Sequence, residues 1–263
     1  MPLKYAILVA GVTSVDGKGN FADMFLRLLR DEGAQEEWQV FTAWEGQLPT
    51  AEQLAEFDGF VITGSVADAF GEDDWLVSLR KTVRAAMQAK KQVLGVCFGH
   101  QLVGSALGAK VGRAGCWEVG AREVEVAPDS RRQLAEAGAG WAKLLPERLC
   151  LLEFHQDQVL EAPEGAAVLA SSERCPVEMF AVGPHVLCIQ GHPEFDTEVV
   201  QSLAEPRLEK FGEADVERMR AQPCGAACGQ GRAASAAAVQ GFPEGGRWCA
   251  EHLTPLTHQA DAA

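Results

Sequence analysis

The sequence is poor in positive charge and has no long hydrophobic run. Its 263 residues carry 23 Lys and Arg against 37 Asp and Glu, which gives a net charge of −14. No basic stretch is present to neutralise phosphates, so we expect neither nucleic acid nor an anionic membrane as a partner. No apolar run approaches the roughly 20 residues that cross a bilayer. The apolar run at residues 5–12 is too short for a signal peptide, and Asp16 and Lys18 soon follow, so we expect a buried first strand.

Cysteine is scarce for a secreted scaffold. The eight cysteines are scattered along the chain, and Cys97, Cys150 and Cys188 fall in apolar, strand-like runs. This distribution argues against a disulfide-dense scaffold and favours reduced thiols in a cytoplasmic protein. What the chain has is 47% hydrophobic residues over a length that suits one domain, or one domain with an extension.

Short apolar runs alternate with helical periodicity in the first hundred residues. We expect strands at residues 4–10, 38–42, 60–63 and 93–96, and helices at residues 21–30 and 75–87. This alternation predicts an α/β fold with a doubly wound, mostly parallel sheet. From Cys150 onward the expected strands lie closer together, at residues 168–170, 179–182 and 185–190. The loops between them are too short for crossover helices, so we expect a mixed or antiparallel second half.

The composition changes near residue 215, where we place a domain boundary. Residues 1–215 form the expected catalytic domain, and residues 216–263 form an Ala/Gly-rich, flexible tail. The tail contains a set of residues that resembles zinc ligands: Cys224, Cys228, Cys249 and His252. Their spacing is loose and no strand or turn pattern supports a zinc module, so we expect no metal site.

The strongest functional signal surrounds one cysteine. The apolar strand at residues 93–96 leads into Cys97, which stands between Gly95 and Gly99 and is followed by helical sequence. A nucleophile on a tight strand-to-helix turn has this pattern, because side chains two residues before and after it would clash. The helix directs its N-terminal amides toward the sulfur, which favours the thiolate, and leaves the Phe98 N–H facing a developing oxyanion. We therefore predict that Cys97 is a nucleophile.

The alternative, that Cys97 is one more buried cysteine, is opposed by the paired glycines. Several hydrolase lineages share the turn, so a partner is needed. His192 and Glu194 follow an apolar strand with Pro193 between them. Residues two apart in extended backbone point the same way and Pro193 restricts φ, so the carboxylate can orient the imidazole. Although a lone histidine at a strand end is more often structural, this combination predicts a triad of Cys97, His192 and Glu194.

The two motifs resemble those of the class I glutamine amidotransferases, whose turn reads Gly-x-Cys-x-Gly-x-Gln and whose later motif reads His-Pro-Glu. The resemblance covers roughly residues 4–200 and implies the flavodoxin-like fold of that family. It implies that Gln101 holds the α-amino acid end of a γ-glutamyl group. It also implies that Ser65 supplies a second oxyanion N–H, with Gly64 allowing the close approach.

The segment at residues 154–159 resembles the family's loop that lines the γ-glutamyl pocket. His155, Gln156 and Asp157 are therefore candidate substrate contacts. For His155 a purely local hydrogen bond is an equal alternative.

Three segments resemble the γ-glutamyl peptidases known from plants, which are stand-alone enzymes that remove glutamate from glutathione and its conjugates. They are residues 19–25, 64–75 and 97–101. Two features depart from that subgroup. Val66 stands where a Pro is usual, and the Ala/Gly-rich tail has no counterpart.

The leading hypothesis is cleavage of the γ-glutamyl bond of glutathione or its conjugates through a thioester on Cys97, with no cofactor and a small-molecule substrate. The alternative is a glutaminase subunit that delivers ammonia to a separate synthase. The chain has no room for a synthetase domain after residue 200, which favours the peptidase. A non-catalytic binding module is a third possibility, which the intact Cys97, His192 and Glu194 oppose.

Overall fold

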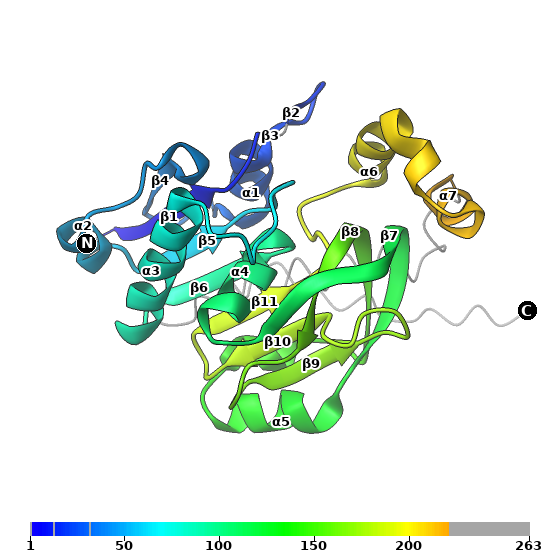
Figure 1. Cartoon of the computed structure of the whole chain (residues 1–263). Coiled ribbons are helices and arrows are strands. Elements are labelled where there is room, and N and C mark those ends of the chain that lie inside the picture. The colour runs from blue at the N-terminus through cyan, green and yellow to red at the C-terminus, as the bar shows by residue number, and fades with distance from the viewer. Residues whose placement is uncertain (1, 13, 32, 221–263) are drawn as a thin grey trace, which may run out of the picture.

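The computed structural model describes residues 2–12, 14–31 and 33–220. Within these residues one mixed sheet has the strand order β4-β1-β5-β6-β11-β10-β9-β7-β8 (Figure 1). Its strands are β1 (Leu3–Val9), β4 (Glu36–Thr42), β5 (Gly59–Ile62), β6 (Gln92–Val96), β7 (Lys110–Val126), β8 (Arg148–Glu161), β9 (Ala167–Ser171), β10 (Met179–Val182) and β11 (Val186–Ile189). A separate short hairpin joins β2 (Ser14–Val15) to β3 (Gly19–Asn20).

The helices of the described residues connect these strands. The α-helices are α1 (Phe21–Leu29), α2 (Ala51–Glu56), α3 (Asp74–Gln88), α4 (Phe98–Ala106), α5 (Pro128–Glu136), α6 (Thr197–Ala204) and α7 (Glu213–Arg220). Short 3-10 helices are η1 (Ala43–Glu45), η2 (Gly140–Leu144) and η3 (Glu205–Lys210). The expected helices at residues 21–30 and 75–87 are thus α1 and α3, with ends that shift by one residue.

The sheet is parallel at one end and antiparallel at the other. β4, β1, β5, β6 and β11 pair in parallel, and helices α1, α2 and α3 form the crossovers that connect β1, β4, β5 and β6 in turn. The pairs β11–β10, β10–β9, β9–β7 and β7–β8 are antiparallel. The prediction of an α/β fold with a mostly parallel first half and a mixed second half is confirmed.

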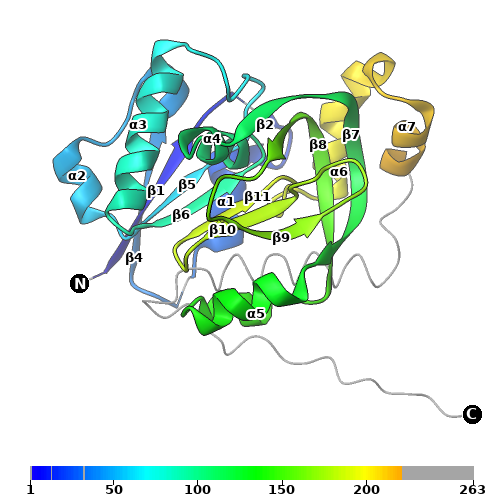
Figure 2. The same cartoon turned by 60° about the horizontal axis from the view of Figure 1, so that its bottom comes forward.

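Alternation along the buried strands divides the core between the two faces of the sheet. On β1, Ile7 packs in the cluster that contains Phe25 of α1, whereas Leu8 packs in the cluster that contains Leu79 of α3 and Leu102 of α4. Helices α1 and α5 therefore cover one face, and α2, α3 and α4 cover the other (Figure 2). A third cluster joins α6 and α7 to the β7–β8 arm.

The sequence pattern did not predict the long antiparallel pair β7–β8, whose strands are connected through α5 and η2. Its pairing is interrupted by a register shift between Arg113 and Glu118, where the ladder with β8 slips. Such an irregularity breaks the period of two on which strand recognition depends. β7 and β8 are the last two strands at one end of the sheet, and they lie beside α6 and α7 (Figure 1).

Helix α7 crosses the expected domain boundary at residue 215. Asp215 is 4% exposed and accepts hydrogen bonds from Arg174 at 2.7 Å and from Arg218 at 2.6 Å. Burial alone would raise the pKa of Asp215, but the two guanidinium groups lower it. Packed structure therefore continues across residue 215, at least as far as Arg220, the last residue described. The expected tail motif of Cys224, Cys228, Cys249 and His252 lies outside the described residues.

Two further expectations concern the cysteines and membranes. Among the described residues, Cys97, Cys116, Cys175 and Cys188 are free thiols. In the described ranges, no helix combines the length and the apolar character that a membrane span needs.

Packing of α7 on β7 leaves no space for a side chain at Gly120. This residue has a φ of +90°, and an added Cβ would lie 2.9 Å from Met219 Cα. We predict that Gly120→Ala lowers the free energy of unfolding by about 1–3 kcal/mol. Gly115→Ala, on the same strand with nothing within 4 Å of an added Cβ, is the control and should change it by less than about 0.5 kcal/mol. Urea titration followed by Trp fluorescence measures both, and equal loss in the two variants would contradict the packing.

Candidate active site

Three neighbouring parallel strands end at the same edge of the sheet. β6 lies between β5 and β11, with Val96 opposite Ile189 in the register. The carboxyl ends of these strands lead to Gly64, Cys97 and His192. Parallel pairing therefore gathers at one edge groups that are up to 128 positions apart in the sequence (192 − 64).

Cys97 occupies a strained turn between β6 and α4. It has φ 53° and ψ −105°, a left-handed backbone that a residue with a side chain rarely adopts. Its N–H donates to Ile189 O at 2.9 Å, which holds the turn against β11. A Cβ on Gly95 would lie 2.6 Å from Gly99 O, and one on Gly99 would collide with Ile62 O. Glycine is therefore required on both sides of the turn, as the sequence pattern predicts.

Helix α4 begins immediately after the cysteine. Cys97 is its N-cap, and Phe98 is its first residue, so the first N–H groups of the helix have no partner within it. The positive end of the helix dipole thus lies at the Cys97 sulfur and favours its thiolate. The Phe98 ring stacks on Trp75 of α3 with centroids 5.9 Å apart, which fixes the start of the helix.

His192 and Glu194 form a buried pair beside Cys97. His192 Nδ1 lies 2.8 Å from Glu194 Oε1, and the two side chains are 3% and 0% exposed. The His192 ring also stacks on Phe195 with centroids 3.9 Å apart, and its backbone N–H donates to Leu152 O at 2.9 Å. With Nδ1 held by the carboxylate, Nε2 is the nitrogen available to the cysteine.

Electrostatics at this pair favour a charged imidazole. Burial alone would lower the pKa of His192, but the negative charges of Glu194 and Cys97, and hydrogen bonds with both, raise it to about 10. An imidazolium at neutral pH is the partner that a thiolate requires. The arrangement is therefore one that could serve as a cysteine nucleophile, an acid–base histidine and a carboxylate that orients the histidine.

The loop after β5 lies against His192. A Cβ on Gly64 would lie 3.2 Å from His192 Cε1, so glycine allows the loop to approach the ring closely. Thr63 Oγ1 accepts from Ala10 N at 3.0 Å and fixes the start of the loop. Ser65 Oγ accepts from Ala67 N at 3.1 Å, which stabilises the turn that follows. This geometry brings the candidate oxyanion loop to the same place as the candidate triad.

The other sequence-predicted residues lie around this centre in different ways. Gln101 is buried, and its Nε2 donates to Asp157 O at 2.7 Å and to Gln190 Oε1 at 3.2 Å. Asp157 accepts from Arg113 at 3.0 Å, and Arg113 also pairs with Asp68 of the oxyanion loop at 2.7 Å. Burial raises the pKa of Asp157 although Arg113 opposes the shift. These contacts attach β8 to the rim of the site.

His155 and Gln156 point to opposite sides of β8. Gln156 is half-buried, whereas His155 is 3% exposed and lies among carboxylates inside the protein. Three of these carboxylates, Glu118, Glu153 and Glu178, were missed by the sequence analysis. Each stands in an apolar segment, and a buried acid within such a segment is the one signal that could have found it.

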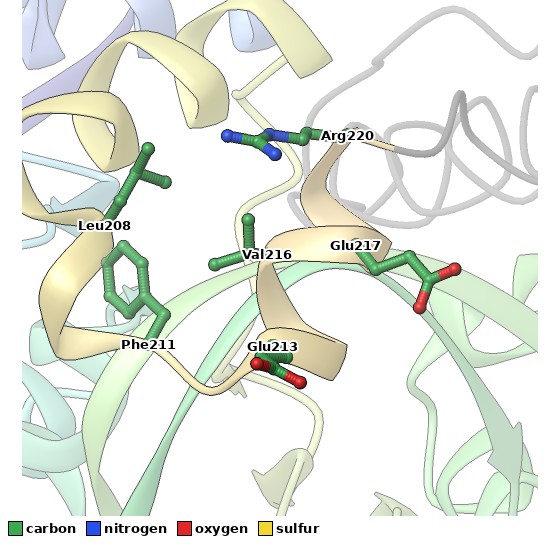
Figure 3. Close-up of a pocket in the computed structure, with 6 residues that line it drawn as sticks. All are labelled: Leu208, Phe211, Glu213, Val216, Glu217 and Arg220. Atoms are coloured by element: carbon green, nitrogen blue, oxygen red, sulfur yellow. The ribbon is translucent and has the colours of Figure 1, made fainter.

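A surface hollow lies elsewhere on the molecule. Figure 3 shows it between η3 and α7. Its lining consists of Leu208, Phe211, Glu213, Val216, Glu217 and Arg220. None of the candidate triad residues lines it, so it is separate from the centre described above.

Comparisons with known proteins agree with this geometry. The family model described as "Glutamine amidotransferase class-I" matches residues 16–203. "Gamma-glutamyl peptidase 3" of Arabidopsis thaliana is 41% identical over 189 residues, which cover 71% of this chain and 74% of that protein. A glutamine-hydrolysing GMP synthase of Aeropyrum pernix is 33% identical over 186 residues, which cover 70% of this chain and 33% of that protein.

The fold also matches a solved structure. A glutamine amidotransferase of Thermotoga maritima aligns with a TM-score of 0.65 at 17% identity, covering 93% of this chain and 99% of that one. This similarity concerns the fold alone, whereas the family match and the 41% identical relative concern the sequence. The chain belongs to the class I glutamine amidotransferase family and is an enzyme of the hydrolase type.

Proposed function

We propose that this enzyme hydrolyses the γ-glutamyl bond of glutathione or its conjugates through a γ-glutamyl thioester on Cys97. The observation that carries the proposal is the 2.8 Å contact between His192 and Glu194 beside a cysteine on a strained turn. The relative named as a γ-glutamyl peptidase, at 41% identity, supports the peptide substrate. A γ-glutamyl small molecule is the substrate class common to the family resemblance and this relative.

The first step is attack of the Cys97 sulfur on the γ-carbonyl carbon. A C–S bond forms, the carbonyl π pair moves to oxygen, and the oxyanion accepts hydrogen bonds from the N–H groups of Phe98 and Ser65. The negative charges and hydrogen bonds around His192 raise its pKa to about 10, so the imidazole is suited to take the Cys97 proton as the sulfur attacks. The strained turn presents the sulfur at the end of α4, where the helix dipole stabilises negative charge.

Collapse of the oxyanion breaks the C–N bond. The leaving amine takes the Nε2 proton of His192, and the thioester remains on Cys97. Loss of the thiolate charge removes one of the causes that raise the His192 pKa, so the imidazole is now able to act as a base. It removes a proton from water, the hydroxide attacks the thioester, and glutamate leaves as the thiolate and imidazolium form again.

Residues at the rim are proposed to hold the substrate. Gln156 is half-buried on β8, and Asp157 is linked through Arg113 to the oxyanion loop. The Gln101 side-chain amide donates its hydrogen bonds to Asp157 O and Gln190 Oε1. We therefore propose that Gln101 shapes the pocket by holding β8 in place. The interior position of His155 favours its alternative, local contacts, over contact with the substrate.

A second candidate function is a glutaminase subunit that delivers ammonia to a separate synthase. The 33% identical GMP synthase, of which the alignment covers one third, supports this possibility. The chemistry at Cys97 is the same, and only the leaving group differs.

Loss of the sulfur tests the nucleophile. We predict that Cys97→Ala lowers γ-glutamyl hydrolysis by at least about 10³-fold, because it removes the sulfur on which the acyl intermediate is proposed to form. Cys116→Ser replaces a free thiol outside the triad and should retain activity within about twofold. Glutamate release is the measurement, and comparable loss in both variants would contradict the assignment.

Removal of the Glu194 charge tests the ion pair. We predict that Glu194→Gln lowers the His192 pKa from about 10, so the imidazolium no longer sustains the thiolate near neutral pH. Alkylation of Cys97 by iodoacetamide at pH about 6.5 should slow by about tenfold and converge with wild type above about pH 9, where a thiol ionises unaided.

Peptide mass spectrometry follows Cys97 separately from the other thiols in this experiment. Glu198→Gln, which alters an exposed carboxylate paired with Lys18, is the control and should match wild type. Superimposable pH profiles for Glu194→Gln and wild type would rule out the charged pair.

The substrate is tested by offering glutathione, a glutathione S-conjugate and glutamine separately. We predict that glutamate is released faster from the peptides than from glutamine, because the proposed pocket accepts a peptide amine as leaving group. Release of glutamate from glutamine alone would contradict the peptidase function and favour the glutaminase function. No release from any of the three, with Cys97 unreactive toward iodoacetamide, would exclude catalysis.

A further inference from the structure

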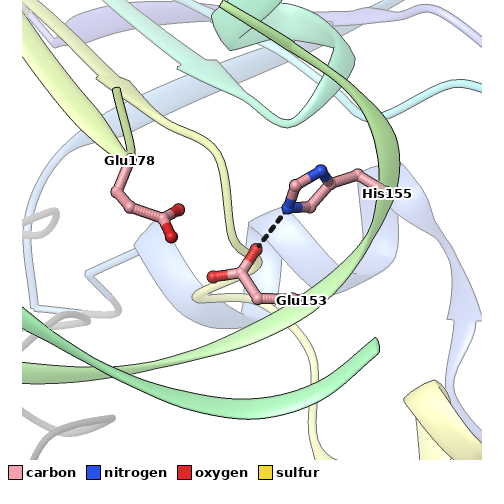
Figure 4. A group of neighbouring side chains, drawn as sticks. All are labelled: Glu153, His155 and Glu178. Carbon is pink, nitrogen blue, oxygen red and sulfur yellow. Dashed lines mark ion pairs between the residues drawn. The ribbon is translucent and has the colours of Figure 1, made fainter. Parts of the chain in front are cut away.

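Three fully enclosed side chains converge inside the protein behind the candidate triad. Glu153 and His155 come from β8, and Glu178 comes from the residue just before β10 (Figure 4). Their exposed fractions are 0%, 3% and 0%. One ligand-type atom from each lies within 4.8 Å of the others. We call these three residues the Glu-His-Glu cluster.

The polar atoms of this cluster make no hydrogen bond of good geometry with the described residues. Ser172 interacts with the Glu178 carboxyl group and the Asp157 backbone with the His155 ring, but Glu153 has neither kind of contact and both of its oxygens are unsatisfied. His155 Nε2 and Glu153 Oε2 lie 3.1 Å apart, yet their orientation is not that of a hydrogen bond. Buried polar groups are rarely left in this state, since each costs about 1–3 kcal/mol.

We propose that the Glu-His-Glu cluster is a binding site for a divalent transition metal ion, with Zn²⁺ as the ion that fits it best. Carboxylate oxygen and imidazole nitrogen are ligands of Zn²⁺, and two ligands of a tetrahedral ion are about 3.3 Å apart. The 3.1 Å separation of His155 Nε2 and Glu153 Oε2 is close to this spacing. This site departs from the expectation that the chain has no metal ligands.

Charge balance supports a cation. Two carboxylates enclosed in the interior repel each other, and an ion of charge +2 between them neutralises both. Two basic groups act on Glu153, but each is already paired: His192 with Glu194 at 2.8 Å and Arg122 with Glu118 at 2.6 Å.

The position of the cluster gives the ion a structural role. β8 pairs with β7, and neither β10 nor β11 is its neighbour in the sheet. An added Cβ on Gly191 would lie 2.5 Å from Glu153 Oε1, and Gln190 N donates to Glu178 O at 2.8 Å. An ion here would tie β8 and the start of β10 to the loop that carries His192.

The competing account is that the Glu153 and Glu178 carboxyl groups are protonated and form hydrogen bonds with each other. Glu178→Gln separates the two, because glutamine has the shape and hydrogen-bonding capacity of a protonated glutamate but loses the anionic ligand. A metal site loses its ion in this variant. A proton-sharing cluster tolerates the change.

The experiment loads the full-length chain with Zn²⁺, removes excess ion by desalting and measures bound zinc by mass spectrometry. We expect wild type to hold about one equivalent more than Glu178→Gln. Glu161→Gln, a change of an exposed glutamate on the same strand, should hold as much as wild type. Because all three proteins share every other cysteine and histidine, the difference reports the cluster alone.

A chelator supplies the stability readout. It should lower the melting temperature of zinc-loaded wild type and Glu161→Gln and leave Glu178→Gln unchanged. Equal zinc in all three proteins, or a Glu178→Gln protein as stable as the zinc-loaded wild type, would overturn the proposal. These readouts require no activity, so their failure is distinct from failure of the proposed hydrolysis.

A measurement on wild type covers the case in which Glu178→Gln does not fold. X-ray absorption at the zinc edge should show mainly oxygen and nitrogen at about 2.0–2.2 Å, with at most one sulfur. A shell of several sulfurs at about 2.3 Å would assign the ion to cysteines elsewhere and contradict the cluster as its site.

Discussion

Parallel pairing of β6 with β5 on one side and β11 on the other is the constraint on which the centre depends. The loop that follows each strand begins at the same edge of the sheet, so Gly64, Cys97 and His192 lie close together although they are far apart in the sequence. The hydrogen bond from Cys97 N to Ile189 O, 2.9 Å long, continues this pairing into the turn itself. A shift of one residue in the β6–β11 register would move the cysteine away from the histidine.

The strained backbone conformation of Cys97 is tolerated because packed elements hold the turn in place on every side. A left-handed backbone at a non-glycine residue costs about 1–3 kcal/mol, which the packed elements around it must offset. Gly95 and Gly99 allow β6, α4 and Ile62 to approach closely, and apolar clusters fill both faces of the sheet. The same packing buries His192 and Glu194, and burial strengthens the electrostatic coupling that keeps the imidazole charged.

The strand-to-helix turn and the His-Pro-Glu motif could be predicted from the sequence, because each is formed by residues that are neighbours in the chain. The antiparallel pair β7–β8 could not, because its register shifts between Arg113 and Glu118 and interrupts the two-residue alternation by which a strand is recognised. Nor could the Glu-His-Glu cluster, because Glu178 comes from a segment that no ladder joins to β8. The boundary at residue 215 was placed by composition and stays a prediction; composition does not show the ion pairs of Asp215 with Arg174 and Arg218.

The central claim, an acyl intermediate on Cys97, is tested most directly by quenching the enzyme with acid during turnover of glutathione and measuring the mass of the protein. The account predicts that the chain gains the mass of one γ-glutamyl group, that digestion places the group on the peptide with Cys97, and that hydroxylamine removes it as expected for a thioester. Turnover with no adduct on that peptide, or an adduct on another residue, would contradict it.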